Sequence, residues 1–488
     1  MAVNGNQVEQ SDSAQTGPLA SLVILLGYMF VPFSIRLSNT TLYPLFDAVM
    51  PFARDINVGT GVAVSLAVVM SALHKPRLLK ARLLGVGAVA AALGGSAMME
   101  TGLALGSPAL LCSGAILRSM GTAWTSLLAS VACCDLAPRW LFAGIPAASF
   151  AGYALSWAVA SLSERAALIL LAASPIAVYL CCHTGANRLI GEIAEAPAQD
   201  GARLMRPASY LPFTSRMFVC MFFATAVLGF NLRLGPIEGG AASPLASLFA
   251  LATLALLGWF GTRIHLYDAT FKAAIVLAVA AFLIMPLKSY LPLAQDLLTV
   301  AAACFDTVFA LVMIAASTRN RFSAVTVLSW GSVMSTAGSI VGANLGVFVS
   351  ASAESDTAFL ASAAAATALV AYVLFGLSNF SFAGTIAGIE PVQPLQVPQT
   401  SDTQRFEDAC ARVAQSGGLT PRETEVLALL ARGRNNAFVQ EELTLTRNTV
   451  KAYIKHIYAK LNVHSQQELI DLVEKGNSQR EAASNRTS

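Results

Sequence analysis

The stretch RNTVKAYIKHIYAKL, residues 447–461, places cationic side chains at helical spacing. Arg447, Lys451 and Lys455 recur every four residues, so one face of a helix carries all three, with His456 beside them. Such side chains can reach guanine O6 and N7 atoms or phosphates in the major groove of DNA. A second stripe of the same helix is apolar and predicts packing against a core: Val450, Ile454, Ile457 and Leu461.

Capping signals before and after this helix predict three more short helices. Thr420, Pro421 and Glu423 form a capping box with proline at the first helical position, and Gly433 ends that helix. The other two are predicted to begin at Asn435 and Ser465, and Thr446 is the predicted cap of the basic helix itself. The tight connection before Thr446 predicts a helix-turn-helix. A solvated basic face on an ordinary helix is the alternative, and the neighbouring caps and turn weigh against it.

Residues 419–474 resemble the DNA-binding domain of LuxR-type regulators, through LTPRETEVLALLARG, EEL, NTVKAYIKHIYAKLNVHS and QEL in order. The resemblance implies a dimer on an inverted repeat of double-stranded DNA, with Lys451, Ala452 and Lys455 facing the bases. Phe438-Val439-Gln440 departs from the family's usual Glu-Ile-Ala, and Tyr453 stands where histidine is common. The predicted DNA-binding set is Arg447, Asn448, Thr449, Lys451, Ala452, Lys455, His456 and Lys460.

The rest of the chain is strongly apolar. Hydrophobic residues make up 55% of the 488 residues and charged residues 12%, against about 25% charged in soluble proteins. A membrane span needs about 20 mostly apolar residues. We predict twelve spans, six on each side of a longer connection over 184–214: 19–36, 56–74, 83–101, 108–131, 140–162, 166–183, 215–233, 244–262, 272–288, 292–316, 323–349 and 357–378.

Basic residues in the connections predict the orientation. One set of loops contains 13 lysines and arginines and the opposite set contains 5, and the richer set is expected to face the cytoplasm. The sequence therefore predicts a multi-pass protein of the cell membrane with both termini cytoplasmic. We expect a disordered N-terminus over 1–18, a membrane domain over 19–378, a proline-containing linker and short helix over 379–418, the helix-turn-helix domain over 419–474, and a disordered tail over 475–488.

Twelve spans in two sets of six resemble the topology of the major facilitator superfamily. The predicted fold class is accordingly all-α: a major-facilitator-like helical membrane bundle joined to a small four-helix DNA-binding domain. Transporters of that superfamily often carry a signature with an acidic residue between spans two and three. The corresponding loop here, SALHKPRLLKAR, is basic and has no acid.

Arg118 and Asp306 lie near the middles of the fourth and tenth predicted spans. A charge at the bilayer centre costs about 2.5–3.5 kcal/mol on insertion scales, so it normally faces a cavity and a partner. In the resembled fold these spans line a central cavity. The two side chains are expected either to form a salt bridge between the halves or to contact a small-molecule ligand. Trp124 and Tyr153 are further candidates for that cavity, although aromatic residues in spans are more often packing residues.

Two functions agree with these patterns. The first is a one-component transcription regulator, in which the membrane domain senses a small molecule and the C-terminal domain binds a promoter. The alternative is a transporter with a regulatory DNA-binding tail. The sequence contains no recognisable nucleophile–base or metal-ligand constellation, so we expect neither an enzyme nor a cofactor.

Overall fold

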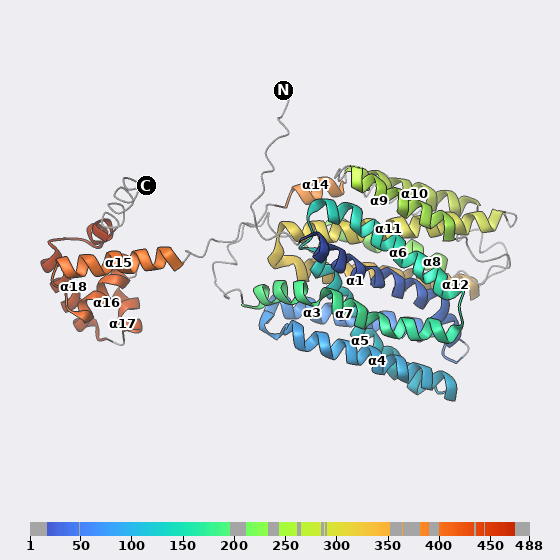
Figure 1. Ribbon diagram of the computed structural model, residues 1–488, viewed down its shortest axis with the longest axis horizontal. Coiled ribbons are helices and arrows are strands. Elements are labelled where there is room, and N and C mark those ends of the chain that lie inside the picture. Colours follow the sequence, from blue (N-terminus) through green and yellow to red (C-terminus); the bar gives the residue numbers. More distant parts are fainter. Residues whose placement is uncertain are drawn as a thin grey trace, which may run out of the picture. The chain divides into compact units, whose positions relative to one another are not determined.

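The computed structural model is helical throughout the regular elements that it describes (Figure 1). The chain divides into two compact units, Met1–Val392 and Gln393–Ser488, called here the N-terminal and C-terminal units. The described residues are 17–47, 49–195, 211–232, 244–260, 265–284, 287, 290–351, 364, 381–389, 400–433, 436–443 and 445–473.

The first half of the N-terminal unit contains six long helices. They are α1 (Pro18–Leu37), α3 (Ala53–His74), α4 (Ala81–Leu105), α5 (Pro108–Cys133), α6 (Pro138–Ala160) and α7 (Glu164–Glu195). A π-helical turn, η1 (Ser38–Leu42), and the short α2 (Tyr43–Asp47) prolong α1, and the 3-10 turn η2 (Pro76–Leu78) joins α3 to α4. Proline occupies the first helical position of α1, α5 and α6, where its missing N–H has no partner to lose.

The second half contains five described long helices. They are α8 (Arg216–Leu232), α9 (Pro244–Phe260), α10 (His265–Ile284), α11 (Leu291–Arg319) and α12 (Ala324–Ala351), with the 3-10 turn η6 (Arg321–Ser323) before α12. Eight of the described helices are long and apolar enough to cross a membrane, and α8 and α9 are apolar but shorter. Helices suit this role because every backbone group inside them is hydrogen-bonded internally.

Described helices lie at eleven of the twelve predicted spans, eight of them long and apolar enough to cross a membrane, and the predicted span 357–378 lies outside the described residues. α7 continues to Glu195, well beyond its predicted end at residue 183. Its polar-looking extension stays helical because Ala186, Leu189 and Ile190 are buried there. The predicted disordered ends, 1–18 and 475–488, fall almost wholly outside the described residues, and α1 begins at Pro18.

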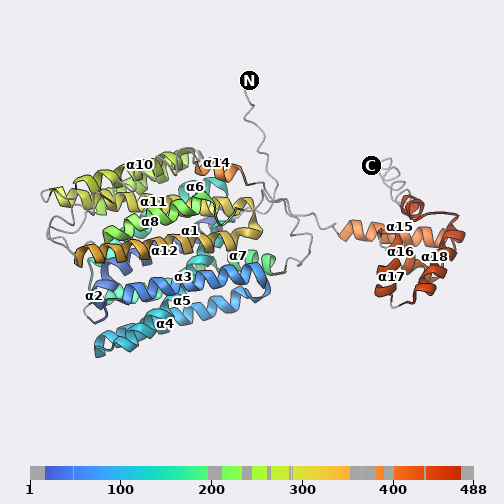
Figure 2. The same cartoon turned by 180° about the vertical axis from the view of Figure 1, so that it is seen from behind.

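The two halves repeat one packing scheme. α1 packs on α6 and α4 on α5 in the first half, whereas α8 packs on α12 and α10 on α11 in the second. The halves meet where α3 packs on α12 (Figure 2) and where α6 packs on α9. The second contact is close: a Cβ at Gly258 would stand 2.3 Å from the carbonyl oxygen of Phe142, so only glycine fits there.

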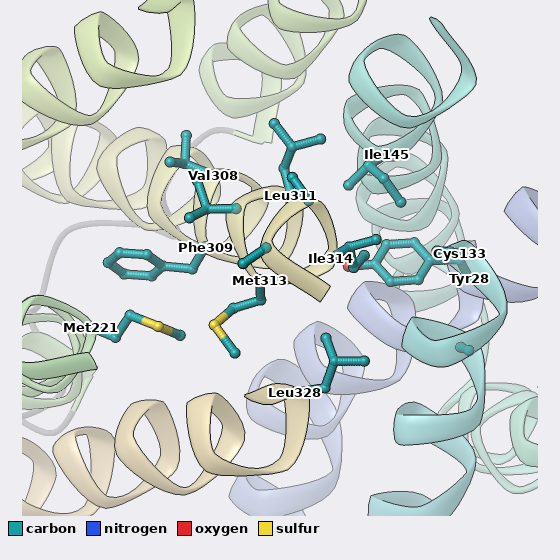
Figure 3. Close-up of a cluster of buried hydrophobic side chains, with 14 of the residues drawn as sticks. Tyr28, Cys133, Ile145, Met221, Val308, Phe309, Leu311, Met313, Ile314 and Leu328 are labelled. Carbon is teal, nitrogen blue, oxygen red and sulfur yellow. The ribbon is translucent and has the colours of Figure 1, made fainter. Parts of the chain in front are cut away.

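α11 lies in the middle of the bundle. Figure 3 shows Val308, Leu311 and Ile314 on this helix, with Ile145 of α6 and Tyr28 of α1 on one side. Met221 of α8 and Leu328 of α12 lie on the other side. The helix therefore contributes to the packing of both halves.

Ionic contacts join the halves at the end of the bundle where α5 stops. Asp135, 1% exposed, accepts a hydrogen bond from Arg188 of α7 at 2.7 Å and another from Arg321 of η6. A second carboxylate, Asp268 in the first turn of α10, accepts from the Ser381 hydroxyl at 2.6 Å and the Phe382 backbone N–H at 2.7 Å. This contact fixes the start of the short helix α14 (Phe382–Ala387) against α10 and α11.

The C-terminal unit is a small helical domain with its own core. Its helices are α15 (Thr400–Ser416), α16 (Pro421–Ala431), α17 (Asn436–Glu442), α18 (Arg447–Leu461) and a last helix over 466–473. The amphipathic helix predicted in the linker is α15, and it packs on α16. The buried core includes Cys410, Val413, Val426, Leu427, Leu430, Val439, Val450, Ile457, Leu469 and Val473.

Candidate DNA-binding face and intramembrane polar clusters

The caps of α16 and α18 have the predicted geometry. The Thr420 hydroxyl accepts from the Glu423 N–H at 3.3 Å, and the Glu423 carboxylate accepts from the Thr420 N–H at 2.7 Å. Gly433 follows α16 with a φ of 74°, as a left-handed helix end requires. Thr446 caps α18 by accepting from the Thr449 N–H at 3.3 Å. The predicted cap at Asn435 lies outside the described residues.

Packing fixes which face of α18 is free. Val450 and Ile457 are fully buried against the core of the unit, and Ile454 and Leu461 are partly buried. The connection from α17 is held by the guanidinium of Arg422, which donates to the Leu443 carbonyl at 3.0 Å. The predicted helix-turn-helix is therefore present, with α18 as its second helix.

Arg447, Lys451 and Lys455 are exposed along one side of α18. Among the described residues, none of the three has a hydrogen-bonding or ionic partner. Asn448 and Ala452 are exposed beside them, while Thr449 is half-buried and its hydroxyl shares a 2.8 Å hydrogen bond with Thr446. The arrangement leaves three cations in line that can bind phosphates or guanine edges.

Lys460 and His456 face a different group. The Lys460 ammonium donates to Glu423 Oε2 at 2.7 Å and to the Gly418 carbonyl at 3.2 Å. His456 Nδ1 lies 3.9 Å from the other carboxylate oxygen. The Glu423 side chain is only 5% exposed, and the hydrogen bond from Lys460, with those from Thr420, lowers the pKa of Glu423 to about 2. Lys460 thus has a structural partner within the domain, which the sequence pattern did not indicate.

Arg118 is buried in the first half of the membrane bundle. It is 4% exposed, and its Nη2 lies 3.4 Å from the Ser38 hydroxyl in the π-helical turn η1. Asn57 of α3 lies in the same region. Its side-chain amide donates to the Tyr43 hydroxyl at 2.8 Å, and its backbone carbonyl accepts from the hydroxyl of Ser119, the neighbour of Arg118, at 2.5 Å. Within the described part of the chain, no carboxylate pairs with Arg118.

Asp306 belongs to another cluster. Its Oδ2 accepts from the Tyr153 hydroxyl of α6 at 3.4 Å, and the Arg36 guanidinium lies 4.8 Å from the centre of the Tyr153 ring. Asp306 is exposed even though α11 packs against helices of both halves. Trp124 is buried, and its indole N–H has no hydrogen-bond partner among the described residues.

The structure therefore separates the two intramembrane charges. Of the two alternatives, the salt bridge between Arg118 and Asp306 is not formed, because Arg118 contacts Ser38 and Asp306 contacts Tyr153. The positions of Arg118 and Asp306 along their predicted spans placed the two residues at similar depths in the membrane. These positions did not fix the direction in which either side chain points. Of the four candidate ligand residues, only Asp306 and Tyr153 are joined by a hydrogen bond. Arg36, at the end of the first predicted span, was not among the candidate residues, although its guanidinium lies beside Tyr153.

Fold and site together define a helix-turn-helix DNA-binding domain joined to a helical membrane bundle. Residues 418–473 match the family described as bacterial regulatory proteins, luxR family. The C-terminal domain is therefore a LuxR-type DNA-binding domain.

Relatives that match this part of the chain are named as regulatory proteins. Over 50 residues the chain is 40% identical to the nitrate/nitrite response regulator protein NarL of Escherichia coli K12, covering 10% of this chain and 23% of that protein. It is 42% identical over 53 residues to the oxygen regulatory protein NreC of Staphylococcus epidermidis, covering 11% and 24%. The chain thus spans about a quarter of the length of these relatives.

Solved structures are similar to the membrane bundle. A crystal structure of a bacterial homologue of the iron transporter ferroportin, in an outward-facing state, has a TM-score of 0.51 at 12% identity and covers 75% of this chain and 99% of that chain. The human organic anion transporter MFSD10 has a TM-score of 0.46 at 16% identity and covers 77% and 100%. The first similarity shows a major-facilitator-like fold. The chain therefore joins a LuxR-type domain to a major-facilitator-like membrane domain.

Proposed function

We propose that this chain is a one-component transcription regulator of the cell membrane. In this proposal the membrane domain, residues 19–378, binds a small molecule, and the domain over 419–474 binds a promoter as a dimer on an inverted repeat. Both termini face the cytoplasm, as the distribution of basic residues in the loops predicts. The observation that carries the proposal is the stripe of Arg447, Lys451 and Lys455, exposed and without intramolecular partners within the described unit.

DNA binding is tested with residues 393–488 as a soluble fragment, since this unit has its own core. We expect it to retard promoter DNA taken from beside its own gene. Lys451→Ala and Lys455→Ala should each cost about 1–3 kcal/mol and relax base preference if they contact bases, or lower the salt slope by about one if they contact phosphate. Arg412→Gln removes an equal charge from an exposed position on α15, outside the helix-turn-helix, and should change DNA binding little. Failure to retard any neighbouring promoter would contradict the proposal.

We propose that the membrane domain senses its ligand through Asp306 and Tyr153, which share a hydrogen bond, and through the polar cluster around Arg118. A ligand controls a protein only when it binds two conformations with different affinity. The support is the cost of placing Arg118 in the bundle without a carboxylate partner among the described residues, together with an exposed acid on the central helix. An anionic group would satisfy Arg118, and a hydrogen-bond donor would suit Asp306.

The sensing residues are tested by a promoter reporter in cells, screened across a panel of small organic acids and amines. The soluble fragment contains neither Arg118 nor Asp306, so its DNA binding is measured independently of the variants Arg118→Gln and Asp306→Asn. In the full chain, each should fix transcription at one level regardless of the inducing compound. Normal dose dependence in both variants would place the sensing site elsewhere, without affecting the DNA-binding result.

A further inference from the structure

A basic groove lies at one end of the bundle, between the start of α4 and the end of α7. Its volume is about 860 Å³, within the roughly 300–1,000 Å³ that small-ligand sites occupy. Among the residues that the structure describes, no acidic residue lines it. The lining consists of Arg77, Leu79, Lys80, Ala81, Arg82, Leu83, Val86, Asn187, Gly191 and Ala194.

The groove lies at the edge of the membrane. η2 is the turn between α3 and α4, and both helices are long and apolar enough to span a bilayer, so the turn must lie at a membrane–water boundary. About one helical turn after the start of α4, this helix and α7 are in direct contact, because a Cβ at Gly85 would stand 2.5 Å from the Tyr179 ring of α7. The groove is therefore closed toward the bundle centre and accessible from the boundary.

Cationic and apolar side chains occupy different parts of the groove. Arg77, Lys80 and Arg82 are exposed, and none has a hydrogen-bonding or ionic partner in the described part of the chain. Below them, Leu83 is 69% exposed and Val86 55% exposed on α4. Cations above an apolar wall match a molecule with an anionic head and hydrocarbon chains.

One further atom bears on the headgroup. The Oδ1 oxygen of Asn187 is buried and accepts no hydrogen bond from the described residues. A buried acceptor of this kind is costly unless a donor reaches it. A headgroup carrying hydroxyl groups beside its phosphate supplies that donor, whereas a bare phosphate diester does not.

We propose that this groove binds one anionic phospholipid of the phosphoglycerol class. The phosphate lies among Arg77, Lys80 and Arg82, a glycerol hydroxyl donates to Asn187, and an acyl chain covers Leu83 and Val86. The site is adjacent to Arg188, whose contact with Asp135 belongs to the cluster that joins the two halves. Lipid bound here therefore also holds the end of α7 that carries this contact.

The test is titration of the full chain in detergent with dioleoyl phosphatidylglycerol, dioleoyl phosphatidylcholine or inorganic phosphate. Binding is followed by native mass spectrometry and thermal unfolding. We expect one tightly bound phosphatidylglycerol that raises the unfolding temperature and little effect of the other two. The triple variant Arg77→Gln, Lys80→Gln, Arg82→Gln should weaken that binding roughly 100-fold, at about fivefold for each cation.

A matched control removes two arginines and one lysine from exposed positions elsewhere: Arg216→Gln, Lys272→Gln and Arg319→Gln. It should bind phosphatidylglycerol like the wild type. Leu83→Gln with Val86→Gln keeps every cation and should still weaken binding, which separates a lipid from a free anion. Equal binding in the two triple variants would overturn the proposal, as would equal stabilisation by inorganic phosphate. If the triple variant fails to fold, Lys80→Gln alone is measured against Lys272→Gln by the same criteria.

Discussion

Replacing Lys460 with methionine tests whether this residue supports the DNA-binding domain from within. Methionine keeps most of the side-chain stem and removes the ammonium that donates to Glu423 at 2.7 Å. A hydrogen bond to a charged group contributes about 1.5–3 kcal/mol. Because Lys460 is 37% exposed, solvent screens the interaction, and about 1.5 kcal/mol is the appropriate loss. For a domain of this size that lowers the unfolding temperature by about 6–12 °C.

The dependence on pH identifies the carboxylate as the partner. The folded-state pKa of Glu423 is lowered to about 2, below the ordinary value of 4.5. Stability from a lowered carboxyl pKa is fully present above the unfolded-state value and is lost as the pH falls toward the folded-state value. The stability difference between wild type and Lys460→Met should therefore be largest above about pH 5 and shrink as the pH approaches 2.

The assay is thermal unfolding of residues 393–488, wild type and Lys460→Met, at a series of pH values from 7 to 2.5. Titrations common to both proteins cancel in the difference. DNA affinity measured at neutral pH, well below the unfolding temperature, should fall less for Lys460→Met than for Lys455→Met. A stability difference that is independent of pH would refute the assignment of Glu423 as the partner. A larger loss of DNA affinity for Lys460→Met than for Lys455→Met would indicate that Lys460 contacts DNA.

Three further outcomes follow from the membrane unit. Asp135→Asn leaves Arg188 and Arg321 without a shared carboxylate and should destabilise the detergent-solubilised chain by about 2 kcal/mol. This value is lower than that for fully buried pairs because both arginines are partly exposed. An unchanged unfolding temperature would contradict this expectation. Asp268→Asn weakens the bonds to α14, so chymotrypsin should cleave after Phe382 faster than in the wild type, and equal rates would exclude the carboxylate as the fixing contact. Reporters inserted at 196–210 and 233–243 should report opposite sides of the membrane, the first cytoplasmic, and a shared side would break the six-plus-six arrangement.

The DNA-binding face could be predicted from sequence because its signals are local. Four-residue spacing places Arg447, Lys451 and Lys455 on one side of a helix, and apolar residues at helical spacing place the other side in a core. The capping box and the glycine end follow from residues within one or two turns. The role of Lys460 could not be predicted in this way, because its partner Glu423 lies 37 residues earlier on another helix.

Intramembrane charges show where sequence reasoning stops. Hydropathy fixes the depth of Arg118 and Asp306, but not the rotation of either helix or the identity of its neighbours. The π-helical turn places Ser38 beside Arg118, and no pattern in the sequence indicated such a turn. Contacts such as that between Asp135 and Arg321, 186 residues apart, are equally invisible to local patterns.

The packing of α3 on α12 can form only after a long stretch of chain has been synthesised. Arg54 at the start of α3 donates to Ser339 of α12 at 2.9 Å, and 285 residues separate the two. At roughly 5–20 residues per second, a ribosome needs about 15–60 s to reach the second residue after the first. For that interval α3 resides in the bilayer while its partner does not yet exist. The early half of the bundle must therefore be stable, and resist premature pairing with other chains, without the helix that finally covers it.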